Sequence, residues 1–435
     1  MPLRNVFIRK KKVIAINTIR RHSMHIGISL FASDKGKSGI SQYMINLLKA
    51  FEEVDQQNTY TLFLAEEDQH VFQFTGDRFQ KVITSNFANK PSVNILWHQT
   101  VFAYHLLKHK FDVVFMPAAN RRLSICTTSP TVGTIHDLCQ FRIGQKYDPY
   151  RMFYVQKILP MLAKRLSHIV TPSHCSKDDV VTFYGIPEDR ISAVHNGIDH
   201  SKYFKRDKVG SLSILNAKYH IQPGYILYLS RLEHPGKNHV RLIEAFSQLK
   251  KSGMLKQKLV LVGAPWNGHE KIYEAVKRMD LEKDVIFPGF VEGNDLPHFV
   301  SGADLFIYPS LFEGFGIPVI EAMASGIPVA CSNTSSLPEI VEDAALLFDP
   351  LDCNDIAEKI IAAINDEATR SMLMEKGLEQ AKRYTWQAAA KKILTLLEVA
   401  GGGKNSQMRD KEKKTPPTSF VETYGDTAPP SKGGD

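Results

Sequence analysis

The sequence predicts an α/β fold made of two doubly wound domains that face each other across a cleft. Short apolar runs alternate along the chain with helix-length segments, a pattern typical of parallel sheets with helices on both faces. The alternation breaks at a polar stretch, residues 200–213, and restarts near residue 225. With 435 residues, 43% of them hydrophobic, the chain can bury two separate cores.

The alternation in the first half begins after Met24. An apolar run there ends in a Gly- and Ser-rich turn at Ser33–Gly39, and apolar residues at helical spacing follow as far as Phe51. Further strands are expected at Tyr60–Leu64, Asp112–Met116, Thr131–Ile135 and His168–Thr171.

The second half repeats this pattern. Helices are expected at Val240–Lys251 and, as the last element, at about Thr385–Val399. Doubly wound sheets bind ligands at the carboxyl ends of their strands, so the loops that follow these strands are the candidate site. The expected strands are Tyr225–Ser230, Lys258–Val262, Val285–Phe287, Asp304–Tyr308, Pro328–Cys331 and Ala345–Phe348.

The net charge of +8 gathers at the two ends of the chain. Residues 1–23 carry seven Lys or Arg and no acid, and residues 401–435 carry six basic against five acidic residues, so the segment 24–400 has no net charge. A neutral body excludes nucleic acid as a partner. The basic N-terminal segment indicates either contact with an anionic membrane or a protein whose translation begins at Met24. The polar segment 401–435 is expected to be disordered.

Cysteine usage and hydropathy predict a cytoplasmic protein. The five cysteines show no paired spacing and are expected to be reduced thiols. The sequence shows neither an apolar run that could span a bilayer nor the apolar core of a signal peptide. The amphipathic segment Met152–Ile169 is expected either to pack on its own sheet or to lie on the inner membrane surface as a peripheral contact.

Two familiar nucleotide-binding motifs fail in this sequence. Gly36-Lys37-Ser38 looks like the end of a P-loop, but Phe31 stands where that motif needs a glycine, and no G-x-G-x-x-G follows the first strand of either half. The loop Gly36–Gly39 remains a weaker candidate, because small residues before a helix let backbone amides approach an anion. Such loops are also common as ordinary turns.

The richest stretch of the sequence runs from Tyr308 to Ala324. A strand is expected to end near Tyr308, a Gly-rich turn follows, and Pro318 suits the first helical position. Glu313 and Glu321 then flank a helix start whose amides suit a diphosphate, and both carboxylates can accept from sugar hydroxyls. The alternative is a cap at Glu313 and a solvated Glu321.

Two cations and one histidine are further candidates. Arg231 and Lys237 follow a predicted strand and suit a diphosphate leaving group, although they also fit as ordinary surface cations. His136 follows another strand and can donate a hydrogen bond or move a proton, although most histidines are structural. The sequence has no Asp-x-Asp, no His-Glu-x-x-His and no Cys/His cluster, so no metal is predicted.

Five motifs lie along the chain between about Met24 and Val399. They are Thr134-Ile135-His136-Asp137, His195-Asn196-Gly197-Ile198-Asp199, Ser230-Arg231-Leu232 with Lys237-Asn238, Val285-Ile286-Phe287-Pro288-Gly289, and Glu313-Gly314-Phe315-Gly316-Ile317-Pro318 with Glu321. Together they resemble glycosyltransferase family 4, whose members include bacterial mannosyltransferases.

The resemblance implies a GT-B architecture of two Rossmann-like domains. Together with the charge and composition of the ends and the polar stretch 200–213, it divides the chain into a basic extension (1–23), an acceptor-side domain (24–205), a nucleotide-sugar domain (206–384), a helix that returns to the first domain (385–400) and a disordered tail (401–435).

Roles for the site residues come from the same resemblance. In the family pattern Arg231 and Lys237 bind the diphosphate and Glu321 holds the ribose. Glu313 and the Gly314–Ile317 backbone contact the sugar.

Three further positions are assigned in the same way. Phe287 lies at the base, Gly39 near the phosphates, and His136 over the transferred sugar. The family commonly has a Gly-Gly pair where this chain has Ser38-Gly39, so the sequence departs from the pattern at this loop.

The implied reaction is transfer of a hexose, with retention of configuration and without a metal, to a glycan or lipid-linked acceptor. The donor is a nucleotide diphosphate sugar, which acts as substrate, so no cofactor is expected. Mannose from GDP-mannose in surface polysaccharide or lipopolysaccharide biosynthesis is the first choice, and UDP-glucose or another donor is the alternative. A nucleotide-sugar epimerase and a non-catalytic sugar-binding protein are alternatives from other classes.

Overall fold

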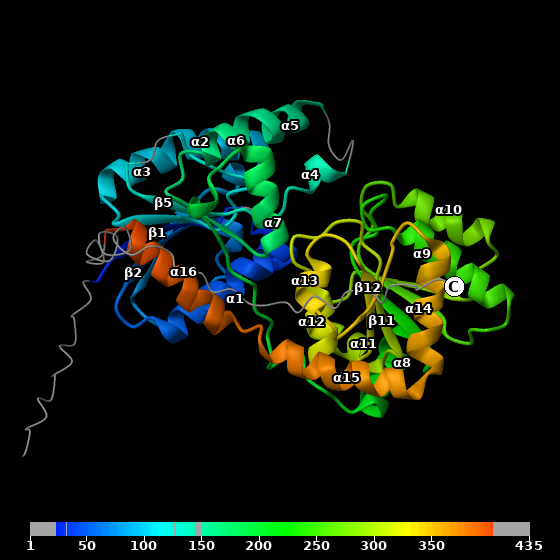
Figure 1. The fold of residues 1–435 in the computed structure, drawn as a ribbon. Helices are drawn as coiled ribbons and strands as arrows, with labels where there is room; N and C mark the ends of the chain where they lie inside the picture. The colour runs from blue at the N-terminus through cyan, green and yellow to red at the C-terminus, as the bar shows by residue number, and fades with distance from the viewer. Residues whose placement is uncertain (1–22, 32, 126–127, 144–148, 403–435) are drawn as a thin grey trace, which may run out of the picture.

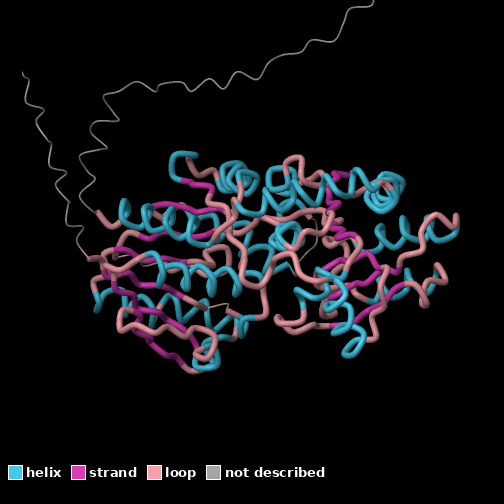
Figure 2. Tube along the Cα trace, turned by 90° about the horizontal axis from the view of Figure 1, so that it is seen from below, coloured by secondary structure: helices cyan, strands magenta, loops and turns pink. Residues whose placement is uncertain are grey.

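Each half of the chain forms its own parallel sheet with helices on both faces (Figure 1). The computed structural model describes residues 23–31, 33–125, 128–143 and 149–402. Most of the predicted basic extension and disordered tail therefore lies outside the described residues. Figure 2 shows the strands in two separate groups, one in each domain. The predicted two-domain α/β fold is confirmed.

The first sheet has seven strands in the order β3-β2-β1-β4-β5-β6-β7. All neighbouring strands are parallel, so their carboxyl ends lie along one edge, and the order reverses direction between β1 and β4. The strands are β1 (His25–Ser29), β2 (Thr59–Ala65), β3 (Phe79–Thr84), β4 (Val113–Met116), β5 (Thr131–Thr134), β6 (His168–Thr171) and β7 (Ile191–Ala193).

The sequence prediction misses the two edge strands of this sheet, β3 and β7. Central strands are covered on both faces and therefore read as continuous apolar runs, whereas β3 exposes Gln80 and Lys81. β7 has three residues, too few for a recognisable pattern.

Helices cover both faces of the first sheet, with α1 and α16 on one side and α2, α3, α5 and α6 on the other (Figure 1). The α-helices formed before the second domain are α1 (Gly39–Val54), α2 (Pro91–Gln99), α3 (Val101–His109), α4 (Cys139–Arg142), α5 (Pro149–Phe153), α6 (Leu159–Ala163) and α7 (His174–Asp179). Short 3-10 helices are η1 (Asp34–Gly36), η2 (Glu66–Asp68), η3 (Asn86–Asn89) and η6 (Glu188–Arg190), and the π-helical segments are η4 (Tyr154–Ile158) and η5 (Val180–Tyr184).

The second sheet has six parallel strands in the order β10-β9-β8-β11-β12-β13, and each coincides with a predicted one. The strands are β8 (Tyr225–Leu229), β9 (Lys258–Val262), β10 (Val285–Gly289), β11 (Leu305–Tyr308), β12 (Val329–Ser332) and β13 (Leu346–Phe348). The remaining helices are α8 (Lys208–Tyr219), α9 (His239–Lys251), α10 (Glu270–Arg278), α11 (Leu296–Gly302), α12 (Ile317–Ala324), α13 (Leu337–Val341), α14 (Cys353–Asn365), α15 (Glu367–Lys382) and α16 (Trp386–Ala400).

The amphipathic segment 152–169 does not form one helix. Helical backbone ends at Ala163, and Ile169 already lies in β6. Leu159 and Leu162 are buried in the first domain's core, while Met161 is exposed. Within the described residues, no helix is both long and apolar enough to cross a membrane.

The chain crosses between the domains twice, and the two crossings lie side by side. Ile198 forms a bridge with Thr385, and a Cβ on Gly197 would lie only 2.1 Å from the Trp386 nitrogen, so only glycine fits there. Beyond the second crossing, α16 packs beside α1 and supplies the first domain's core with the apolar side chains Trp386, Ile393 and Leu397.

The first crossing comes earlier than the boundary predicted at residue 205. Val194 belongs to the core of the first domain, whereas Ile198 and Tyr203 are buried in the core of the second. The polar stretch 200–213, on which the predicted boundary rests, is therefore part of the second domain.

Candidate active site

The strand order of the second sheet places two candidate loops next to each other. The sheet reverses direction between β8 and β11, and in doubly wound folds the loops after such strands form the ligand site. Arg231 and Lys237 follow β8, and Glu313 follows β11. The Leu311 amide donates to the Gly236 carbonyl at 3.0 Å, which joins the two loops.

Lys237 and Glu313 form an ion pair where these loops meet. Lys237 Nζ lies 2.6 Å from Glu313 Oε1, and both side chains are less than one-fifth exposed. Burial alone would lower the pKa of Lys237, but the adjacent Glu313 carboxylate raises it above its usual value. Lys237 is therefore a fixed positive charge at neutral pH.

Arg231 lies in a more open position on the same loop. Its side chain is 47% exposed, its guanidinium carbon lies 4.8 Å from the centre of the Trp266 ring, and Nη2 lies 3.4 Å from Glu233 Oε2. The ring and the carboxylate orient the guanidinium while leaving it accessible to a ligand. The sequence analysis did not identify Trp266. Only its position in the loop after β9, at the carboxyl edge of the sheet, could have marked it as a site residue.

The loop Gly314–Ile317 brings the second domain into contact with the first. A Cβ on Gly314 would lie 2.1 Å from the His136 carbonyl oxygen, so the two backbones meet too closely for any side chain. Gly316 has a φ of 95° at the start of α12, a left-handed conformation that favours glycine. Phe315 is buried, and Ile317 is the first residue of α12.

Glu321 lies apart from Glu313 and has different partners. It faces Tyr203 and Lys202, on the segment that enters the second domain. Burial raises the pKa of Glu321 to about 8, and Asp199 adds to the shift, whereas Tyr203 and Lys202 act against it. Glu321 is only partly exposed, so the solvated helix position that was the alternative does not agree with the structure.

His136 follows β5 and is almost completely buried. Its Nε2 lies 2.8 Å from the Pro117 carbonyl oxygen. Because a carbonyl only accepts, Nε2 carries the proton and Nδ1 is an acceptor. Burial lowers the pKa of His136 to about 4. The structure therefore favours a neutral ring that accepts a hydrogen bond over one that moves a proton at neutral pH.

The remaining predicted residues, Gly39 and Phe287, lie in separate elements, one in each domain. Gly39 is the first residue of α1, and a Cβ there would meet open space, so packing within the chain does not require glycine. Phe287 is in β10 and contacts the Tyr273 ring at 4.8 Å between centres. Lys37, just before α1, lies 5.8 Å from the Phe290 ring of the other domain.

Within the residues that the structure describes, His174, His195 and Glu339 form a cluster that could hold a metal ion. Their ligand atoms lie within 4.8 Å of one another. Both Glu339 oxygens already accept hydrogen bonds, however, and two come from amides at the start of α7, where a helix dipole disfavours a cation. None of the predicted site residues belongs to this cluster, and a metal-free donor site remains a prediction.

Two doubly wound domains in contact, with a cationic loop and an acidic Gly-rich loop at one switch point, form a GT-B architecture. The family model "Glycosyl transferases group 1" matches residues 217–380, and "Glycosyltransferase Family 4" matches residues 37–202. The chain belongs to the family 4-like glycosyltransferases and is an enzyme of that class.

Curated relatives and solved structures agree with this assignment. The chain is 33% identical over 256 residues to O-antigen chain mannosyltransferase B of Escherichia coli, covering 59% of this chain and 67% of that protein. It is 27% identical over 336 residues to O-antigen chain mannosyltransferase RfbU of Salmonella typhimurium, covering 75% of this chain and 87% of the relative. The fold matches Anabaena Alr3699/HepE, crystallised with UDP and glucose, with a TM-score of 0.67, 20% identity, and coverage of 86% and 99% of the two chains.

Replacing Glu321 with Gln should flatten the pH dependence of stability. The folded protein keeps the Glu321 proton up to about pH 8, whereas the unfolded chain loses it near pH 4. Between these values the folded state binds more protons, so stability falls as pH rises. We expect Glu321→Gln to be more stable than the parent by on the order of 2 kcal/mol at pH 8, with a smaller difference at pH 5.

Urea unfolding at the two pH values measures this effect. Glu274→Gln, on an exposed side chain of the same domain, is the matched control and should leave the pH slope unchanged. Equal slopes for Glu321→Gln and the parent would show that Glu321 is ionised in the folded protein.

Proposed function

We propose that the enzyme transfers mannose from GDP-mannose, with retention, to a glycan or lipid-linked acceptor in surface polysaccharide biosynthesis. The observation that carries this proposal is the contact between the Gly314 loop and His136. It places the donor loop of one domain against a polar residue at the strand ends of the other. A sugar held by the second domain would then face an acceptor bound to the first.

The proposed chemistry uses the charges of the donor domain. As the bond from C1 of the sugar to the diphosphate breaks, negative charge grows on the leaving phosphate, and Arg231 and Lys237 stabilise it without a metal. The acceptor oxygen bonds to C1 on the same face, and the leaving phosphate takes its proton. Glu313 keeps Lys237 in place and contacts the sugar, and His136 accepts a hydrogen bond from a sugar hydroxyl.

The choice of donor is supported by the names of the relatives. Two O-antigen mannosyltransferases match over much of the chain. UDP-glucose or another hexose donor is the alternative, and the protein bound to UDP and glucose shares the fold only. Glu321 is the proposed ribose partner and the Phe287 backbone the proposed base partner, and both fit either nucleotide.

Release of nucleoside diphosphate tests the donor. With a panel of nucleotide sugars and a polysaccharide or lipid-linked acceptor, GDP release from GDP-mannose should exceed release from the other donors and should depend on acceptor. Faster release of UDP from UDP-glucose would mean that UDP-glucose, not GDP-mannose, is the donor. Conversion of one nucleotide sugar into another without release of nucleoside diphosphate would indicate an epimerase.

Replacing Arg231 with Ala should lower turnover by roughly 10²–10³-fold, the scale of losing one preorganised electrostatic donor. Arg231→Lys should restore only part of the loss, because the ammonium group of lysine cannot donate the two parallel hydrogen bonds of a planar guanidinium. Arg278→Ala, at an exposed arginine of the same domain, is the control. Excess EDTA should leave turnover unchanged. Normal turnover by Arg231→Ala, or loss in EDTA that Mg²⁺ restores, would contradict the metal-free chemistry.

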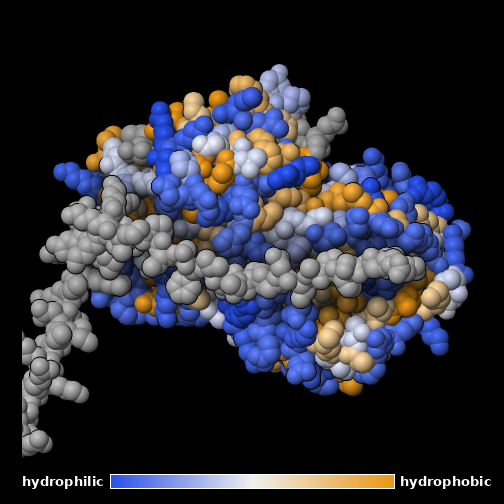
Figure 3. Space-filling model, viewed as in Figure 1, coloured by the Kyte–Doolittle hydropathy of each residue, from blue (hydrophilic) through white to orange (hydrophobic). Residues whose placement is uncertain are grey.

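Peripheral contact with the cytoplasmic membrane face is also part of the proposal. Figure 3 shows apolar side chains over the helices of the first domain. Exposed cations stand among them at Lys108, Lys110 and Arg165, as an anionic membrane requires. This face would bring a lipid-linked acceptor to the enzyme. The exposed apolar side chains on α2, α3, α5 and α6 are Leu96, Val101, Tyr104, Leu107, Tyr150, Phe153 and Met161.

Sedimentation with vesicles tests this surface. The full chain should bind vesicles of phosphatidylglycerol more strongly than vesicles of phosphatidylcholine, and the variant with Leu107→Ser and Phe153→Ser should bind several-fold less. Met372→Ser, at an exposed apolar side chain of the second domain, should bind like the parent. Equal binding by all three proteins would reject this face.

A further inference from the structure

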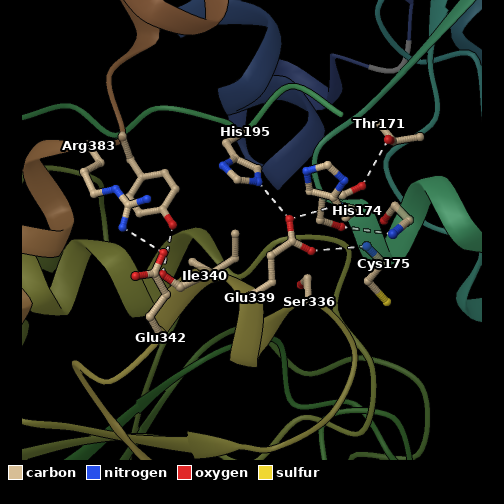
Figure 4. A network of polar contacts seen from close by, with 12 residues as sticks. Thr171, His174, Cys175, His195, Ser336, Glu339, Ile340, Glu342 and Arg383 are labelled. Atoms are coloured by element: carbon tan, nitrogen blue, oxygen red, sulfur yellow. Dashed lines mark hydrogen bonds and ion pairs between the residues drawn. The ribbon is translucent and has the colours of Figure 1, made fainter. Parts of the chain in front are cut away.

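Glu339 joins the two domains at a point that the proposed chemistry does not use. This residue belongs to α13 of the second domain (Figure 4). Its Oε1 accepts from the His174 amide at 2.9 Å and lies 2.8 Å from His195 Nε2, and its Oε2 accepts from the Cys175 amide at 3.2 Å. The two amides belong to α7 of the first domain, and His195 lies on the segment that crosses between the domains. One carboxylate therefore receives two hydrogen bonds across the interface and a third from the crossing segment.

The Glu339 carboxylate is ionised at neutral pH. Its side chain is 21% exposed, and burial alone would raise its pKa. The hydrogen bonds from His195 and from the amides of His174 and Cys175 outweigh burial and lower the pKa below its usual value. Hydrogen bonds to an ionised acceptor are stronger than neutral ones, so this contact contributes more than an ordinary surface pair.

The contacts of Glu339 lie directly beside those of the donor loop. Ser173, the residue before His174, donates its hydroxyl to the Gly314 carbonyl at 2.7 Å. Ser176, on the same turn of α7, lies within hydrogen-bond distance of both the Gly314 carbonyl, at 3.3 Å, and the His136 carbonyl, at 3.2 Å. The start of α7 is thus held by Glu339 on one side and contacts the donor loop on the other.

We propose that Glu339 is a positioning residue that holds the domains in the arrangement in which the Gly314 loop meets His136. Glu339 contacts only protein groups, so it acts through α7 and the donor loop. The inference rests on transfer between the two domains, but not on the identity of the sugar, the base or the acceptor.

A difference between binding and turnover follows from this role. The residues proposed to bind the nucleotide, Arg231, Lys237 and Glu321, all belong to the second domain. Loss of the Glu339 contact would leave them in place while lowering the fraction of molecules with the domains together. Nucleotide affinity should therefore be preserved, and turnover should fall.

The test compares Glu339→Gln with Glu342→Gln. Glu342 lies three residues further along and pairs with Arg383 of its own domain, with Nη1 and Oε1 2.7 Å apart (Figure 4). Both variants lose one carboxylate, but only the first loses the contact between domains. Glutamine can accept only at one atom, so it cannot replace both sides of the Glu339 carboxylate.

We expect Glu339→Gln to lower kcat by about ten- to a hundredfold, the range for losing charged hydrogen bonds that favour one of two states. Its dissociation constants for GDP and UDP should stay within about twofold of the parent. The proposed nucleotide contacts all lie within the second domain, and the substitution removes only a contact between the domains. Small-angle X-ray scattering should give a larger radius of gyration than for the parent. Glu342→Gln should match the parent in all three measurements.

His195→Phe is the second variant. It keeps a ring beside Phe315 but removes one of the three hydrogen bonds, so it should change kcat and scattering in the same direction by less. Thermal unfolding first establishes that each variant folds. Unchanged scattering for a folded Glu339→Gln would overturn the inference, even if no donor in the panel is turned over. If Glu339→Gln has the larger radius of gyration but the parent itself turns over no donor, the inference stands and the proposed donor and acceptor are rejected.

Discussion

The parallel direction of every strand in both sheets is the constraint on which the site depends. Because parallel strands end at one edge of a sheet, the loops after β8 and β11 meet beside the reversal of strand order. The Lys237–Glu313 pair forms there, although its members are far apart in sequence. The same rule places His136 at the equivalent edge of the first sheet. The fold thus assembles polar groups from both domains without any single segment holding them all.

Electrostatics then separates the roles of groups that the sequence presents as alike. Glu313 and Glu321 belong to one motif, but Glu313 lies against a cation whereas Glu321 is partly buried and faces Tyr203. Their environments differ because Glu313 precedes the helix that contains Glu321. Likewise, burial removes the charge of His136, while the partner carboxylate preserves that of Lys237. A pattern of residue types therefore does not by itself predict the protonation state of each group.

The central strands and the Gly-rich turn before α12 could be predicted because their signals are local: an apolar run, a turn rich in glycine, a proline near a helix start. The partners of the site could not. Trp266, Tyr203 and Glu339 each contact residues brought near by the fold, and none stands in a pattern that marks such a contact. Short edge strands escape prediction for a related reason, since partial exposure removes the apolar run. The predicted domain boundary rests on a polar stretch of sequence, and polar residues mark exposed chain rather than the point where burial passes from one core to the other.

The position of α16 has a consequence for the order in which the protein is made. The first domain is encoded first, but its core includes Trp386, Ile393 and Leu397, which follow the whole second domain in the chain. During synthesis the ribosome delivers a complete second domain before it delivers the helix that finishes the first. The nascent first domain therefore exposes the apolar surface beside α1 until the whole second domain has been synthesised and α16 has left the ribosome.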